Sequence, residues 1–137
     1  MFANVLSYLS ILVSLLVLDG LWIGLVMGKL FKKHLAHVLT HSVAWPPVAI
    51  FYLLYAFGIA YFVVWGASHT GHWLAIFGAG VLFGVIAYGT FDLTNQAIIT
   101  GWPTFITVLD MTWGGIYTGI AAILGVLVKR LALGMLK

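Results

Sequence analysis

The 137-residue sequence has no cysteine, no glutamate and only three aspartates. Charged residues make up 7% of the chain, whereas a soluble domain carries roughly 25%. The missing cysteines exclude disulfides and thiolate chemistry, and the scarcity of charge excludes a water-facing fold. We interpret the formal net charge of +3 as loop anchoring to anionic lipid head groups rather than as a nucleic-acid footprint.

Apolar residues are abundant: 64% of the residues are hydrophobic, and the mean hydropathy is +1.16. A spanning helix needs about 20 such residues, and tryptophan or proline marks most ends of the four runs that qualify. The first run lacks a basic segment before it, so we expect a retained helix rather than a cleaved signal. The sequence predicts one domain over 1–137, an all-α integral membrane four-helix bundle with helices at roughly 5–28, 45–65, 73–99 and 103–128.

The segment 29–42, between the first two predicted spans, is too charged to cross a membrane. On a helical wheel its apolar residues gather on one side and its lysines on the other, which predicts a short amphipathic helix along the interface. A short irregular linker is the alternative. We call the face that carries this segment side B; both chain ends and the 66–72 turn then lie on the opposite face, side A. Basic residues flank both faces, with Lys29, Lys32 and Lys33 on side B and Lys129, Arg130 and Lys137 on side A, so their number does not decide the orientation. Because the first helix usually dominates, its flank favours a cytoplasmic side B.

The three aspartates lie inside the apolar runs, where an ionisable group is a functional-site hypothesis by default. At 1.5 Å per residue, the three carboxylates lie about 10–15 Å from the side-B ends of their spans. Polar and aromatic residues share their helical faces, so we expect these faces to meet in one layer. The candidate ligand- or ion-binding residues are Asp19, Trp22, Tyr88, Asp92, Asn95, Asp110 and Trp113.

No lysine or arginine lies within the apolar runs to pair with these carboxylates. Three carboxylates in a low-dielectric layer cannot all be ionised without cations, so the cluster is expected to share protons or to bind a cation or a hydrogen-bonding ligand. The structural alternative is that each aspartate only accepts hydrogen bonds that hold the helices together.

The five histidines form two sets, which we interpret as solvated side chains at the two interfaces. Neither set has a carboxylate or cysteine beside it, so we expect no metal site at the histidines. The sequence does not specify a cofactor. The sets are His34, His37 and His41 in the segment after the first span, and His69 and His72 in the side-A turn.

Three rows of glycines have the small-xxx-small spacing that lets helices approach closely in lipid. We expect them to serve contacts within the chain or in a homo-oligomer. The rows are Gly20, Gly24 and Gly28 on the first span, Gly80 and Gly84 on the third, and Gly115 and Gly119 on the fourth.

These features favour a protein that binds, and could transport, a proton, a cation or a small polar ligand, with Trp22 and Trp113 as walls of the site. A membrane-embedded enzyme acting on a lipid or isoprenoid, with an aspartate as general acid or base, is one alternative. The absence of cysteine and of a serine–histidine pair in the spans argues against it. An accessory subunit of a larger membrane complex is the other alternative.

The run YGTFDLTNQAIITGWP, from Tyr88 to Pro103, resembles the signature of an uncharacterised bacterial membrane-protein family, domain of unknown function 2177. The runs LDGLWIG around Asp19 and DMTWG after Leu109 are similar to its other two motifs. Phe91 stands where the pattern has tyrosine, whereas all three aspartates are in place. The resemblance covers essentially the whole chain and implies a four-helix protein of the bacterial inner membrane, with no assigned activity.

Overall fold

The computed structural model describes residues 1–39, 42–66 and 71–135. Every regular element within these residues is a helix, so the predicted all-α class is confirmed. Two short segments are π-helical, with one extra residue per turn. The elements are α1 (Phe2–Trp22), η1 (Ile23–Met27), α2 (Gly28–His34), α3 (Trp45–Gly58), η2 (Ile59–Trp65), α4 (Trp73–Ile98) and α5 (Thr104–Ala132).

Within the described residues, four continuous helices are long and apolar enough to cross a membrane, as predicted. Their starts follow from the sequence. Proline occupies the first turn of α3, where its missing N–H leaves no hydrogen bond unmade, and Pro103 directly precedes α5. The four helices are Phe2–His34, Trp45–Trp65, Trp73–Ile98 and Thr104–Ala132.

The structure does not show the interfacial helix predicted over 29–42 as a separate element. Residues up to His34 instead continue the first helix, which runs unbroken through α1, η1 and α2. Gly28 has ordinary helical dihedrals (φ −60°, ψ −33°), so it does not interrupt the helix. Extending an existing helix also costs less free energy than nucleating a new one. Leu35, with φ −126°, ends the helix. Thr40 and His41 lie outside the described residues.

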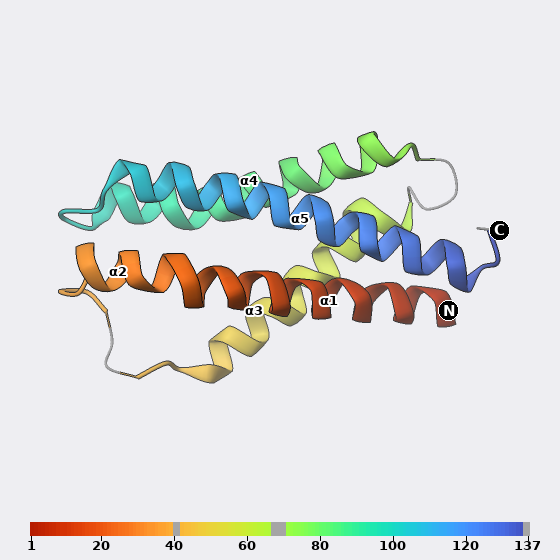
Figure 1. The fold of residues 1–137 in the computed structure, drawn as a ribbon, viewed down its shortest axis with the longest axis horizontal. Coiled ribbons are helices and arrows are strands. Elements are labelled where there is room, and N and C mark those ends of the chain that lie inside the picture. Colours follow the sequence, from red (N-terminus) through yellow and green to blue (C-terminus); the bar gives the residue numbers. More distant parts are fainter. Residues whose placement is uncertain (40–41, 67–70, 136–137) are drawn as a thin grey trace.

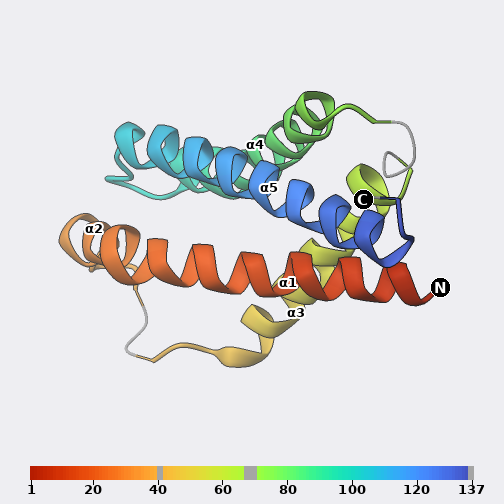
Figure 2. The same ribbon diagram turned by 45° about the vertical axis from the view of Figure 1, so that its right-hand side comes forward.

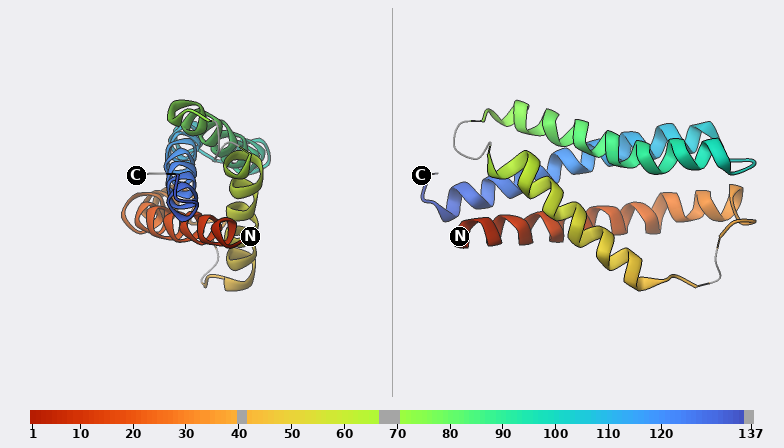
Figure 3. Two further views of the ribbon diagram at one scale, coloured as in Figure 1. Left: turned by 90° about the vertical axis from the view of Figure 1, so that its right-hand side faces the viewer. Right: turned by 180° about the vertical axis from the view of Figure 1, so that it is seen from behind.

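The helices are arranged as a tight antiparallel pair, α4 and α5, with the first helix packed along α5 (Figure 1). Helix α3 crosses obliquely over α1, and its N-terminal half diverges from the other helices (Figure 2 and Figure 3). The start of α1 and the end of α5 lie at the same end of the molecule (Figure 1), in line with the expected common side A. The diverging half of α3 leaves room for a cavity.

Glycines bring α4 and α5 together at backbone distance. A Cβ atom on Gly84 would overlap the Gly114 carbonyl oxygen, and one on Gly80 would lie 2.8 Å from the Gly119 Cα. These predicted glycine rows therefore serve a contact within the chain. Gly20 and Gly24 face outward instead, and a Cβ atom on either would meet no described atom of a neighbouring element within 4 Å.

The π-turn in η1 keeps one face of the first helix directed at the cavity. Asp19, Ile23, Met27 and Phe31 are spaced by four residues, so each step would rotate the face by about 40° in a regular α-helix. The backbone N–H of Gly28 donates to the Ile23 carbonyl five residues earlier, and the extra residue in this turn absorbs rotation. As a result, all four side chains line the same cavity.

Candidate functional site

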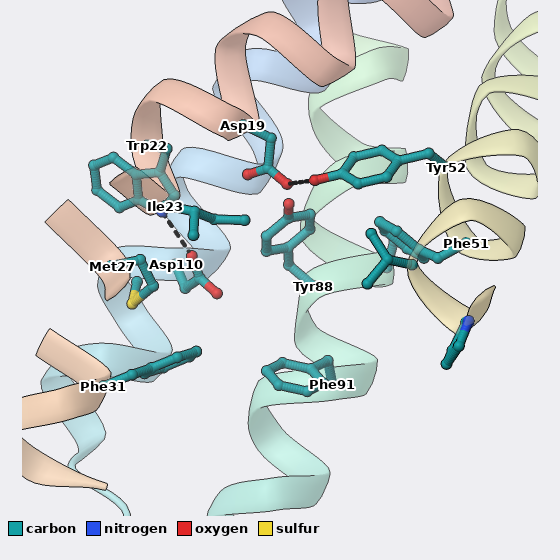
Figure 4. A pocket seen from close by; sticks show the side chains of 13 residues that line it. Asp19, Trp22, Ile23, Met27, Phe31, Phe51, Tyr52, Tyr88, Phe91 and Asp110 are labelled. Atoms are coloured by element: carbon teal, nitrogen blue, oxygen red, sulfur yellow. Dashed lines mark hydrogen bonds between the residues drawn. The ribbon is translucent and has the colours of Figure 1, made fainter. Parts of the chain in front are cut away.

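A cavity of about 490 Å³ lies between the first helix, α3, α4 and α5 (Figure 4). Its volume falls in the range of small-molecule sites, roughly 300–1,000 Å³. It contains polar groups from all four spanning helices. The lining residues are Asp19, Trp22, Ile23, Met27, Phe31, Pro47, Val48, Phe51, Tyr52, Ala87, Tyr88, Phe91 and Asp110.

Asp19 is 4% exposed and lies at one end of the cavity. The hydroxyl of Tyr52, on α3, donates to its Oδ2 atom at 2.6 Å, which ties α3 to α1 across the cavity. The Tyr88 hydroxyl also points toward this end (Figure 4) and donates to the Tyr117 hydroxyl at 2.9 Å. A carboxylate has about four acceptor positions, so Asp19 retains acceptor capacity beyond the Tyr52 hydrogen bond.

Asp110, on α5, is 6% exposed and accepts a hydrogen bond from the Trp22 indole N–H, at 2.9 Å from Oδ1. Its other oxygen points toward the cavity (Figure 4). The Trp22 ring stacks on Trp113 with centroids 4.7 Å apart and an interplanar angle of 11°. Trp113 in turn stacks on Tyr117. This row of rings fixes the orientation of the donor that holds Asp110.

Asp92 does not line the cavity, although the sequence grouped it with the other two aspartates. It is fully buried near Asp110, and neither of its carboxylate oxygens has a hydrogen-bond partner among the described residues. Asn95, one turn further along α4, is half-buried and also outside the cavity lining. Trp113 lies behind Trp22 and supports the site without lining it.

Tyr52 and Phe51 are site residues that sequence reasoning missed. Both come from α3, the one span without an aspartate, so no charged residue drew attention to it. The available signal was the tyrosine hydroxyl itself, a polar group in the middle of an apolar run.

Two histidines of the side-B segment, His34 and His37, contact the first turn of α5 and the turn that precedes it. The His34 ring packs edge-on against Phe105, with centroids 5.3 Å apart, and His37 Nε2 lies 3.1 Å from the Thr100 carbonyl oxygen. His41 and His69 lie outside the described residues.

The cavity is rich in hydrogen-bond acceptors from Asp19 and Asp110. None of the described residues that line it is lysine or arginine. Two basic residues of α5 are occupied at the opposite end of the molecule: Lys129 Nζ donates to the Trp65 carbonyl at 3.0 Å, and Arg130 donates to the Gly71 carbonyl at 2.6 Å. The site therefore offers carboxylate oxygens to a ligand that donates hydrogen bonds or carries positive charge.

Four apolar spans around a buried acidic and aromatic cavity define a multi-pass α-helical membrane protein. The sequence matches the family described as "Predicted membrane protein (DUF2177)" over residues 4–127, and the chain belongs to this family. The resemblance noted in the sequence is thus confirmed. No curated protein and no solved structure matches the chain.

Proposed function

We propose that this protein binds a small polar or cationic ligand in the bacterial inner membrane, with Asp19 and Asp110 as the groups that hold it. The observation that supports this most is the pairing of two buried carboxylates with a cavity of about 490 Å³ whose described lining contains no basic side chain. An unpaired carboxylate in an apolar environment is costly, and a bound cation would compensate that cost.

The geometry of the two carboxylates also suits binding. Tyr52 and Trp22 each donate one hydrogen bond, which fixes the carboxylates in position and leaves further acceptor positions for a ligand. The Trp22 and Tyr88 rings beside the two carboxylates provide aromatic faces that also attract a cation.

The competing interpretation is that both aspartates only hold helices together. Asn variants distinguish the two, because an Asn carbonyl oxygen still accepts from Tyr52 or Trp22 but carries no charge. Loss of binding without loss of the fold therefore points to a site, and unchanged behaviour points to packing.

The homo-oligomer expected from the glycine rows also remains a proposal. It would use Gly20 and Gly24, because the α4 and α5 glycines already pack against each other. Neither of these two glycines is among the residues that line the cavity.

The first prediction concerns ligand charge. Ethylammonium, titrated into purified protein in lipid nanodiscs by calorimetry, is expected to bind wild type. Asp19→Asn and Asp110→Asn should each bind at least about tenfold more weakly, equivalent to about 1.4 kcal/mol, because each removes one negative charge from the cavity. Acetate should not bind, because both carboxylates repel it.

Tyr8→Phe is the matched control, because it removes another hydrogen bond between α1 and α3, from the Tyr8 hydroxyl to the Leu53 carbonyl, outside the cavity. It should bind like wild type. The proposal is wrong if wild type binds no ammonium probe, or if both Asn variants bind it as well as wild type does.

A further inference from the structure

We propose that the ligand is a single-chain amphiphile with a positively charged amine head, which enters the cavity sideways from the lipid phase and places its head at Asp19 and Asp110. This inference rests on the proposed function and names the class of ligand. Three observations support it: the separation of polar and apolar walls, the depth and composition of the opening, and the sign of the charge.

Polar and apolar groups occupy different parts of the cavity. Asp19, Tyr52 and Tyr88 gather at one end, and Phe31 and Phe91 lie at the other (Figure 4). Asp110 lies between the two ends, beside Met27. A small hydrophilic ion would occupy only the polar end and leave the aromatic walls without a partner. A molecule that joins a polar head to a hydrocarbon tail satisfies both parts, since the tail gains apolar contact while the head keeps its hydrogen bonds.

The rim of the cavity is apolar and faces lipid. Ile23, Phe51 and Phe91 line the cavity and are also 48%, 43% and 50% exposed, so they belong to both the cavity and the outer surface. They lie about 9–17 Å inside the side-B ends of their helices, at 1.5 Å per residue. This depth falls within a hydrocarbon core about 30 Å thick.

The opening exists because the N-terminal half of α3 diverges from α4 (Figure 3). A bare ion approaching through this rim would have to leave water for hydrocarbon, which is costly. The charged head of an amphiphile bears the same cost, but its tail is already dissolved in the leaflet and gains apolar contact in the cavity, which is a compensation that a bare ion lacks.

The charge of the head follows from the groups around it. Two carboxylates repel a phosphate or carboxylate head, and no described lining residue is basic. The donors of Trp22 and Tyr52 are directed at the carboxylates themselves. An ammonium group brings three donors and a positive charge, which complements a site of acceptors.

The test compares matched probes in nanodiscs by calorimetry, with the heat of empty nanodiscs subtracted: dodecylammonium, ethylammonium, dodecanol and dodecyl phosphate. Dodecylammonium should bind wild type at least tenfold more tightly than ethylammonium and dodecanol, and dodecyl phosphate should not bind. Ala87→Phe, which narrows the cavity from α4, should reduce the preference for dodecylammonium over ethylammonium at least fivefold. Ala79→Phe, the same change at an exposed α4 position outside the lining, should leave it unchanged.

Each outcome has one meaning. Equal affinity for the two ammonium probes overturns the amphiphile while leaving ligand binding in place, and no binding of either overturns the proposed function itself. Binding of dodecyl phosphate or dodecanol as tight as that of dodecylammonium overturns the charged head. The circular dichroism of the stacked Trp22 and Trp113 rings reports whether each variant retains the folded site. If Ala87→Phe loses this signal, the probe series on wild type still decides whether the ligand is a cationic amphiphile.

Discussion

Asp19, Asp92 and Asp110 share an apolar environment but differ in their hydrogen bonds. Asp19 and Asp110 accept from an aromatic donor, whereas Asp92 has no partner among the described residues. A buried polar group left without a hydrogen bond costs about 1–3 kcal/mol. Hydrogen bonds between helices therefore compensate part of the burial cost of Asp19 and Asp110, whereas no hydrogen bond from a described residue compensates that of Asp92.

This difference predicts opposite effects of the same substitution. Asp110→Leu should lower the free energy of unfolding by at least about 1 kcal/mol, because it leaves the Trp22 N–H without its acceptor. Asp92→Leu should leave it unchanged or raise it, because it removes an unpartnered carboxyl. Thermal unfolding in detergent micelles measures both. Comparable losses in the free energy of unfolding of the two variants would contradict this prediction.

Several residues of the candidate site could be predicted from the sequence, because the rise per residue of a helix gives the depth of each side chain in the membrane. Asp19, Trp22, Tyr88 and Asp110 do line one cavity. The position of Asp92 could not be predicted, since a helical wheel gives the direction of a Cβ atom but not the reach of a side chain. Tyr88 and Asp92 lie one turn apart on the same face of α4. The long Tyr88 side chain reaches the cavity, whereas the short Asp92 side chain is buried outside it.

Among the helices, the contact between α4 and α5 depends on missing side chains. Gly84→Ala would place a methyl against the Gly114 carbonyl oxygen and 2.7 Å from Thr118 Oγ1. The helices must then separate, and we expect a loss of about 1–3 kcal/mol in the free energy of unfolding.

Gly78→Ala, on the same helix, is the control, because nothing lies within 4 Å of its Cβ position. It should stabilise the protein by up to about 1 kcal/mol, since alanine favours a helix over glycine. Denaturation in mixed micelles with increasing SDS measures both variants. An equal effect of the two substitutions would mean that the close contact is not formed.

The helices themselves could be predicted because run length and the residues at the ends specify them: Trp45 starts α3 and Pro103 precedes α5. The π-turns could not be predicted, because they depend on a shift of single hydrogen bonds rather than on a hydrophobic period. The same limitation explains the interfacial segment. Its amphipathic pattern is real, but only the backbone at Gly28 decides whether it continues the first helix or starts a new one.

The orientation of the whole molecule is the last prediction. Lys29, Lys32 and Lys33 are exposed at side B, beside the first span, whose flank usually dominates insertion. Side B should therefore be cytoplasmic and both chain ends periplasmic. Alkaline phosphatase fused to either end should be active, and green fluorescent protein fused there should not fluoresce. Fusions that report opposite sides for the two ends would contradict the four-span topology.

The two basic residues in the last turn of α5 can form their hydrogen bonds only at a late stage of synthesis. Lys129 and Arg130 hold the carbonyls of Trp65 and Gly71, on either side of the connection from η2 to α4. A ribosome makes that connection long before it makes α5. Lys129 and Arg130 can hold these two carbonyls only after residue 130 has emerged, whereas the hydrogen bond from Tyr52 to Asp19 joins α3 to the first helix and does not involve α5. The cavity is thus complete only after α5, which supplies Asp110, has been synthesised.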